Sequence, residues 1–304
     1  MPSPDSARDA SPRFVEPLAE SAPIALRESR RLCRSDPATG EGCADYHGAW
    51  QYLRLLGIVG SAANDAAFFG EALAPLAREG RFPRVLVSGT ADYCLPAQLL
   101  AIYAEAHARL DLTVLDVCET PLFLTRWYAE RVSVGIETHA GDVVDYAPRQ
   151  AFDMIATHCF FGRIAPDRRD AAVAAWYRLL RPGGRLVTVL NRIRPGAPPT
   201  PVRSTEPQTQ LLVERALAAA DRIGPSLGLD RESLISLVRR FAAGNATYPL
   251  TSVEEVRRLF EANGFVLERF DVDAPEAGGL DWRASGPAAV MAFPYGKVVA
   301  TRPV

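Results

Sequence analysis

The chain has 304 residues, enough for one large α/β domain with additions or for two smaller domains, and either would bury a sizeable core. Its hydrophobic content of 48% and charged content of 23% are ordinary for a folded soluble protein. The formal charge of -2 gives no long-range attraction for nucleic acid or an anionic membrane, so neither is expected as a partner.

The amino terminus and the cysteines indicate a cytoplasmic location. The opening residues MPSPDSARDASPRF carry acids and prolines where a secretory signal has a basic start and an apolar core, and no stretch reaches the ~20 apolar residues of a membrane span. The five cysteines are odd in number and scattered, without a CxxC pair, so the sequence predicts reduced thiols and no metal site, structural zinc included. Lys297 is the only lysine beside many arginines, which fits a GC-rich bacterial genome.

Two segments precede the first predicted strand. Residues 1–40 are rich in Pro, Ser, Ala and Arg with weak periodicity, which predicts a mobile arm with one short helix over residues 25–32. Residues 41–80 place apolar side chains at intervals of three and four and form a predicted helical cap. The apolar stretch GIVGSAANDAAFF in this cap suits the surface of a homodimer as well as a cover for a site.

Strands and helices alternate from residue 81 onward. The predicted strands are rich in Val, Ile and Leu and lie at 84–89, 112–118, 134–142, 152–160 and 184–191. The helical patterns between them lie at 96–109, 120–131 and 166–180. This alternation predicts an α/β fold with a mostly parallel sheet and helices on both faces.

The chain after the fifth strand contains a predicted helical insertion. A loop-like stretch, NRIRPGAPPTPVRSTEPQ, leads into two amphipathic helical patterns, so residues from about 196 to 247 form an inserted pair. A lid over a site is the functional interpretation, and extra packing that enlarges the core is the alternative. The alternation resumes with a helix that begins at a capping Ser252 and stops at Gly264, followed by strand candidates over 266–274 and 288–302.

Four stretches in this order resemble a known family. LLRPGGRLVTVL, residues 179–190, ends a helix with an apolar pair, turns on Pro-Gly-Gly and enters a strand. LTVLDVCETPL has an acid at the end of the second strand, HAGDVVDY has one after the third, and FDMIATHCFFGRI holds the fourth strand and its exit. The pattern resembles the class I S-adenosylmethionine-dependent methyltransferases, which have a Rossmann-like seven-stranded sheet with an antiparallel seventh strand. The resemblance covers residues 80–195 well and 250–304 loosely, and implies a methyltransferase domain over residues 81–304.

The resemblance implies S-adenosylmethionine as cofactor and S-adenosylhomocysteine as product. In the family, an acid at the place of Asp116 accepts hydrogen bonds from the ribose hydroxyls, with the following residue, Val117, against the adenine. The family pattern puts Asp142 on the adenine amino group and Val143 in the adenine wall. The cofactor-binding residues implied are Gly89, Thr90, Ala91, Asp92, Asp116, Val117, Asp142, Val143 and His158. A surface acid that caps the next helix would explain Asp116 equally simply, and a Gly-Asp turn would explain Asp142.

The loop after the first strand departs from the family's acid-x-Gly-x-Gly-x-Gly turn. In RVLVSGTADYCL only Gly89 matches, since Val87 replaces the usual acid, and Ala91 and Tyr93 replace the second and third glycines. Asp92 is a nearby substitute for the missing acid. The departure leaves a second hypothesis, a methyltransferase-fold protein that has lost catalysis and serves as a binding or scaffold subunit. An NAD-dependent oxidoreductase is a third, disfavoured because Ala91 and Tyr93 obstruct the approach of a pyrophosphate.

The activity expected is O- or N-methylation of a small organic acceptor by in-line displacement, for which positioning supplies much of the acceleration. His158, at the exit of the fourth strand, is the predicted general base, and packing beside the cofactor is the alternative. The predicted substrate-binding residues are Tyr46, His47, Trp50, Phe160, Phe161 and Arg192. The arginines among the candidates suggest an acceptor that carries a carboxylate.

Overall fold

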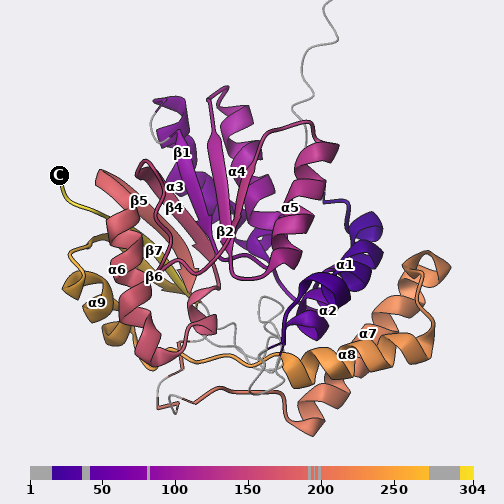
Figure 1. The fold of residues 1–304 in the computed structure, drawn as a ribbon. Coiled ribbons are helices and arrows are strands. Elements are labelled where there is room, and N and C mark those ends of the chain that lie inside the picture. The colour runs from indigo at the N-terminus through magenta and orange to yellow at the C-terminus, as the bar shows by residue number, and fades with distance from the viewer. Residues whose placement is uncertain are drawn as a thin grey trace, which may run out of the picture.

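A seven-stranded sheet lies at the centre of the computed structural model (Figure 1). The model describes residues 16–35, 42–80, 83–190, 193–194, 196–197, 200–273 and 295–304. The strand order is β3-β2-β1-β4-β5-β7-β6, and β7 alone runs antiparallel to its neighbours. The strands are β1 (Arg84–Ser88), β2 (Asp111–Asp116), β3 (Glu137–Ala140), β4 (Phe152–His158), β5 (Leu180–Leu190), β6 (Val266–Asp273) and β7 (Tyr295–Thr301). The predicted seven-stranded, mostly parallel sheet is confirmed.

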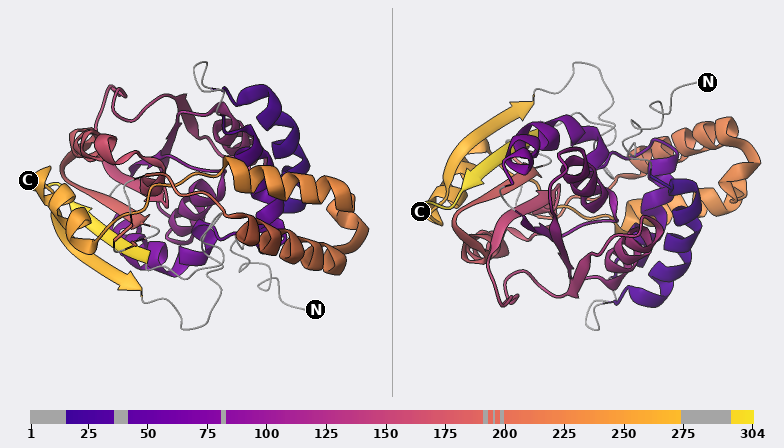
Figure 2. Two further views of the ribbon diagram at one scale, coloured as in Figure 1. Left: turned by 90° about the horizontal axis from the view of Figure 1, so that it is seen from below. Right: turned by 90° about the horizontal axis from the view of Figure 1, so that it is seen from above.

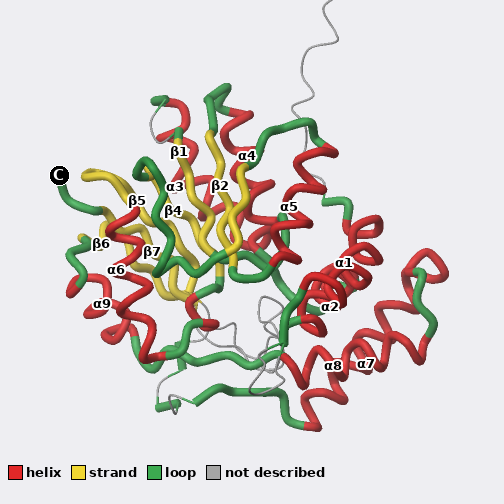
Figure 3. The backbone as a smooth tube through the Cα atoms, viewed as in Figure 1, coloured by secondary structure: helices red, strands yellow, loops and turns green. Residues whose placement is uncertain are grey.

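Helices cover both faces of the sheet, as the alternation of strands and helices predicts (Figure 3). One face packs against α3 (Ala66–Arg78), α4 (Cys94–Glu105) and α5 (Glu119–Arg131). The other packs against α6 (Arg169–Leu179) and α9 (Val253–Ala262). Successive side chains of β1 enter the two cores in turn, because neighbouring residues of a strand point to opposite faces of the sheet.

The turn and capping residues identified in the sequence lie at or near the ends of helices. Gly183 has a φ of +74°, in the left-handed region, and α6 ends at Leu179, before Pro182. The hydroxyl of Ser252 accepts a hydrogen bond from the backbone N–H of Glu255 at 2.9 Å and caps α9. Gly264, with a φ of +87°, follows the end of that helix. Ser252 and Gly264 therefore mark the two ends of α9, whereas the Pro-Gly-Gly stretch lies within β5, which begins at Leu180 and not after this stretch as predicted.

The amino-terminal region is more ordered than predicted. A helix of 15 residues, α1 (Leu18–Leu32), packs against α2 (Ala44–Leu55) in both views of Figure 2. The prediction of a mobile arm is wrong for this helix, while residues 1–15 and 36–41 lie outside the described residues. The contact face of α1 carries small side chains such as Ala22 and Ser29, and a Cβ at Gly48 of α2 would lie 2.6 Å from the Ser29 hydroxyl. Small side chains at this contact let the two helices approach closely.

The predicted cap over residues 41–80 divides between two layers. Its first helix, α2, joins α1, whereas α3 lies on the sheet and follows the short helix η1 (Ala62–Asp65). The inserted pair consists of α7 (Glu206–Ile223) and α8 (Arg231–Gly244), which pack on α2 away from the sheet (Figure 1). The other short helices are η2 (Phe161–Arg163), η3 (Pro166–Arg168) and η4 (Gly224–Leu227). Among the described residues, no helix has the length and apolar character to cross a membrane.

Candidate functional site

Two cavities open at the carboxyl ends of the parallel strands, where ligands of open α/β sheets bind. Cavity A has a volume of about 270 Å³ and lies between the loop after β1, the start of α2 and the end of β4. Cavity B has a volume of about 310 Å³ and extends from the same loop toward the residues after β3 and to α6. The wall residues that both cavities share are Gly89, Asp116, Val117, Phe160 and Arg163.

The loop after β1 forms the boundary between the cavities. Gly89 has a φ of +74°, and its N–H donates to the carbonyl of Leu115 at 2.8 Å. The Phe160 ring packs so closely on this glycine that an added Cβ would lie 2.2 Å from it. Thr90 and Ala91 also line cavity A, so these predicted loop residues do face a pocket.

The two unusual residues of this loop have defined partners. The Tyr93 hydroxyl forms a hydrogen bond with Ser21 at 2.9 Å, and its ring stacks on Tyr128 at 4.8 Å between centroids. Tyr93 therefore packs among α1 and α5 and fills neither cavity. Asp92 lines cavity A, but one carboxylate oxygen accepts from Arg54 at 2.6 Å and the other from the N–H of Cys94 at 2.8 Å. Both oxygens of Asp92 are thus engaged by the protein.

Asp116 has the position that the sequence predicts, at the carboxyl end of β2. One carboxylate oxygen accepts from the N–H of Thr90 at 2.9 Å and the other from that of Cys118 at 2.8 Å. Burial raises the pKa of the Asp116 carboxyl to about 6, although both hydrogen bonds act to lower it. Each oxygen keeps a second lone pair, so the carboxylate can accept further hydrogen bonds from a ligand. The neighbouring Val117 is 69% exposed and lines both cavities.

Asp142 and Val143 lie in the wall of cavity B. One Asp142 oxygen accepts from the N–H of Val144 and the other from Arg168, each at 3.0 Å. Val143 is buried and belongs to the core between the sheet and α6. Cavity B is consequently apolar on one side and carries a carboxylate on the other.

His158 ends β4 and lines cavity A, where it pairs with a buried acid absent from the sequence predictions. Its Nε2 lies 3.0 Å from Asp65, which is 3% exposed and whose other oxygen lies 4.0 Å from the ammonium of Lys297. Burial by itself lowers the pKa of His158, but the electrostatic interaction with Cys159 and the hydrogen bond to Asp65 outweigh it and raise this pKa to about 10. The imidazole is therefore protonated at neutral pH. Its Nδ1 has no hydrogen-bond partner within the described part of the chain.

Aromatic side chains and a guanidinium complete cavity A. Tyr46 and Trp50, both from α2, line it together with Phe160. The Arg163 guanidinium lies over the Tyr46 ring, 4.3 Å from its centroid, and donates to the carbonyl of Ala246 at 2.9 Å. The Trp50 indole N–H is buried and has no acceptor among the described residues. Cavity A thus combines aromatic walls with two cationic side chains and a spare donor.

The structure supports ligand contact less well for the other three predicted substrate-binding residues than for Tyr46, Trp50 and Phe160. Phe161 is 1% exposed in the core beside Trp176 and lines neither cavity, so a role in substrate binding is not supported. His47 lines cavity A, but its Nδ1 faces the thiols of Cys33 and Cys118. Arg192 lies outside the described residues.

Sequence reasoning missed Asp65, and it missed the pairing of Arg54 with Asp92, because in both cases the partners are distant in the chain. Asp65 lies 93 positions from His158, and Arg54 lies 38 positions from Asp92. The local sequence of Asp65 signals only a helix start, since Ser61 and Asn64 form a capping box just before it. No spacing rule connects these pairs, because the sheet and α2 bring them together only after folding.

A comparison with known proteins agrees with the strand order. Residues 94–188 match the family model described as a methyltransferase domain. This match supports the resemblance of residues 94–188 to the class I S-adenosylmethionine-dependent methyltransferases. The matched segment runs from the start of α4 to β5 and so contains Asp116, Asp142 and His158.

Among curated proteins, thiocyanate methyltransferase 1 of Arabidopsis thaliana is 38% identical over 60 residues, which are 19% of this chain and 26% of that protein. The chain therefore spans about a quarter of the length of the curated relative that it matches. Among solved structures, magnesium protoporphyrin IX methyltransferase from Synechocystis has a TM-score of 0.47 and 12% identity, with 84% of this chain and 94% of that chain covered. The N-methyltransferase NodS of Bradyrhizobium japonicum has a TM-score of 0.45 and 14% identity, with 80% and 100% covered.

Proposed function

We propose that this protein transfers a methyl group from S-adenosylmethionine to a small organic acceptor that carries an anionic group. The observation that carries the proposal is the position of Asp116, in the shared wall of two cavities at the carboxyl edge of the sheet. Its carboxylate has lone pairs left for two ribose hydroxyls, and Gly89 leaves room for close approach of a ligand to the backbone. Cavity B, with Asp142 and Val143, suits the adenine.

When bound, the cofactor supplies a methyl group on a positively charged sulfur. The protein's part is to hold the acceptor in line with that group and to keep water away, which accounts for much of the acceleration in such a displacement. Cavity A is suited to this task because Tyr46, Trp50 and Phe160 give it flat apolar walls. A planar organic acceptor would pack between these rings.

The cations of cavity A support an anionic acceptor. His158 is protonated at neutral pH, so we infer a hydrogen-bond donor at this position in place of the predicted general base. Asp65 engages Nε2, which leaves Nδ1–H to meet an acceptor oxygen. Arg163 adds a second positive charge at the same wall. An oxygen that is already ionised needs no base, so the site is better suited to carboxylate or phenolate O-methylation than to a neutral alcohol.

A binding or scaffold role is the second candidate, and one observation favours it. Val87 is fully buried where the family has an acid, and Asp92 is committed to Arg54. The charge of the one carboxylate in the loop after β1 is therefore already paired with a guanidinium, which weakens its attraction for the cofactor's ammonium group. A protein that retained the fold but lost the cofactor would show this combination.

Calorimetric titration with S-adenosylmethionine and S-adenosylhomocysteine distinguishes the two candidates. The proposal expects binding that Asp116→Ala weakens about tenfold, or about 1.4 kcal/mol. Asp111→Ala is the matched control, since Asp111 begins the same strand at the opposite edge and pairs with Arg84 at the surface. Absence of binding to either compound, by protein that circular dichroism shows to be folded, would favour the scaffold role. Equal losses in both variants would refute the assignment of Asp116.

The acceptor class needs a separate assay. Wild-type protein with radiolabelled cofactor should methylate members of a panel of aromatic carboxylates and phenols, and should methylate neutral alcohols and amines of similar shape far more slowly. Arg163→Gln should raise KM for the anionic acceptor more than it weakens cofactor binding, because the Arg163 charge faces the acceptor cavity A and its side chain also lies in the wall shared with cavity B. Methylation of neutral analogues at the same rate would contradict the anionic acceptor.

A further inference from the structure

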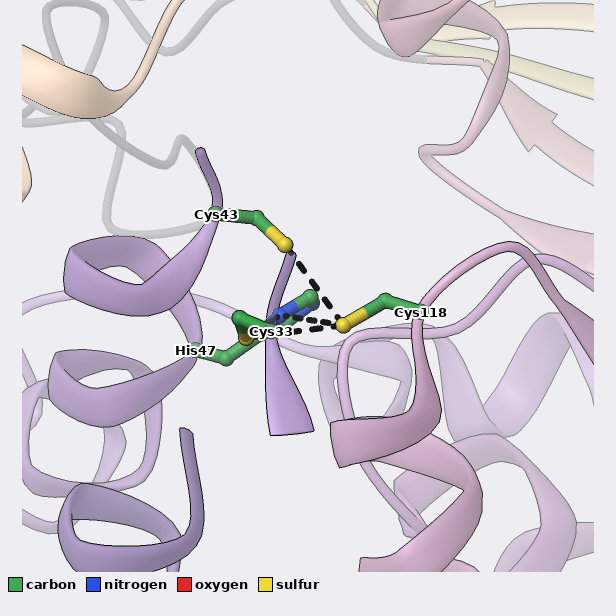
Figure 4. Close-up of side chains that lie close together, drawn as sticks. All are labelled: Cys33, Cys43, His47 and Cys118. Carbon is green, nitrogen blue, oxygen red and sulfur yellow. Dashed lines mark hydrogen bonds between the residues drawn. The ribbon is translucent and has the colours of Figure 1, made fainter. Parts of the chain in front are cut away.

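Four potential metal ligands from three parts of the chain converge beside cavity A (Figure 4). Cys33 directly follows α1, Cys43 and His47 lie at the start of α2, and Cys118 directly precedes α5. In Figure 4 the side chains from α2 and from the β2–α5 turn point toward one another, with Cys33 between them. Their donor atoms all lie within 4.8 Å of one another.

Four of the six distances among these donor atoms are close to the edge lengths of a zinc tetrahedron, and the other two are within 4.8 Å. The Cys118 sulfur lies 3.5 Å from each of the sulfurs of Cys33 and Cys43, and His47 Nδ1 lies 3.3 Å from Cys33 and 3.4 Å from Cys118. Bonds of about 2.3 Å to sulfur and about 2.0 Å to nitrogen in tetrahedral geometry give edges of about 3.8 and 3.5 Å. Small side-chain rotations would therefore admit an ion. The sulfurs are much farther apart than the ~2.05 Å of a disulfide bond.

The ligand types and their surroundings also suit zinc. Three thiols and one imidazole form one of the usual closed structural sets, with no position left for water. His47 and Cys118 are 6% and 7% exposed, and the Thr120 hydroxyl lies 3.1 Å from the Cys33 sulfur, where it can donate to a thiolate. Such outer hydrogen bonds orient ligands and tune affinity. Cys43 and His47 are four positions apart, which places them on one side of the first turn of α2.

We propose that Cys33, Cys43, His47 and Cys118 bind one zinc ion that fastens α1 and α2 to the end of β2. This replaces the expectation of no metal site, which considered only ligand pairs close in sequence. The proposal is independent of the methyl-transfer function. The ion would fix the wall of cavity A, because Cys118 lies two positions after Asp116 and both Cys43 and His47 line that cavity.

Metal analysis of the purified full chain tests the site. Protein prepared under reducing conditions with zinc supplied should hold one equivalent of zinc, and Cys118→Ser or Cys43→Ser should reduce this to a small fraction. Cys94→Ser and Cys159→Ser are matched controls, because both cysteines lie in cavity A outside the cluster. These controls should retain the full equivalent. Thr120→Val should weaken zinc binding about tenfold, as loss of an outer hydrogen bond does.

A second measurement on unaltered protein keeps the proposal testable if the serine variants do not fold. Replacement of zinc by Co²⁺ should give the intense visible absorption of a tetrahedral cobalt thiolate site. Absence of both zinc and this absorption, with all thiols free by titration, would overturn the proposal. A thiol titration that finds two cysteines joined as a disulfide in the native protein, or equal zinc in Cys118→Ser, would also overturn it.

Discussion

Replacing Gly89 by alanine probes the loop that separates the two cavities. The glycine combines two constraints, a φ of +74° and the ring of Phe160 packed over its Cα. A Cβ would lie 2.2 Å from one ring carbon and 2.5 Å from two others, including Cγ. Because Cγ is near the base of the side chain, rotation of the ring alone does not clear the contact.

The two constraints have separable costs. The left-handed backbone costs a residue with a Cβ about 1–2 kcal/mol, and forcing a methyl group into a filled site costs about 1–3 kcal/mol. We therefore expect Gly89→Ala to lower the free energy of unfolding by about 2–5 kcal/mol. Gly80→Ala is the control for the backbone part, since Gly80 has a φ of +67° and nothing within 4 Å of its Cβ position.

A double-mutant cycle, with the free energy of unfolding measured in urea, separates the backbone cost from the steric cost. In a Phe160→Ala background the steric part disappears, so Gly89→Ala should cost only about 1–2 kcal/mol there, close to the value for Gly80→Ala. The m-values of all variants should agree, because the surface exposed on unfolding hardly changes. A cost for Gly89→Ala no greater than that for Gly80→Ala, or an unchanged cost when Phe160 is removed, would refute the reasoning.

Two further predictions concern buried charges. Asp92→Asn keeps the hydrogen bond that caps α4 but leaves Arg54 paired only with Glu16, so the free energy of unfolding in urea should fall by about 3 kcal/mol; a loss below about 1 kcal/mol would contradict a structural ion pair. Since the pKa of His158 is raised in the folded state by its interactions with Cys159 and Asp65, its stabilisation is complete below pH 6.5 and is lost as pH rises toward 10. Unfolding measured across this window should show a decline that His158→Gln lacks, and parallel profiles would count against the pair.

The order of strands and helices followed from the sequence alone. Buried strands need short runs of apolar residues and surface helices need a period near 3.6, and both patterns are local. The same holds for Ser252 and Gly264, whose capping roles involve only residues in the adjacent turn. Asp116 could be placed for the same reason, because the end of β2 is readable from its neighbours and the carboxyl edges of parallel strands meet.

The amino-terminal helix shows where local patterns stop being informative. α1 buries small residues such as Ala22 and Ser29 in place of a stripe of large apolar side chains, and these small residues allow close packing against Gly48 of α2. The opposite case is Phe161. It is an aromatic residue at the exit of β4, as a pocket residue would be, but its side chain is buried in the core. In both cases the helix or strand that packs against the residue, and not the residue type, decides whether its side chain is buried.

The chemistry of the candidate site was decided by tertiary structure. His158 could be recognised as a residue at the exit of β4, but its protonation depends on Asp65 from η1. Likewise, Cys33 and Cys118 are 85 positions apart and become neighbours only because α1 lies against the turn after β2. Secondary structure is encoded within a few residues, whereas a pKa or a ligand set depends on atoms a few ångströms apart in space, and folding alone brings those atoms together.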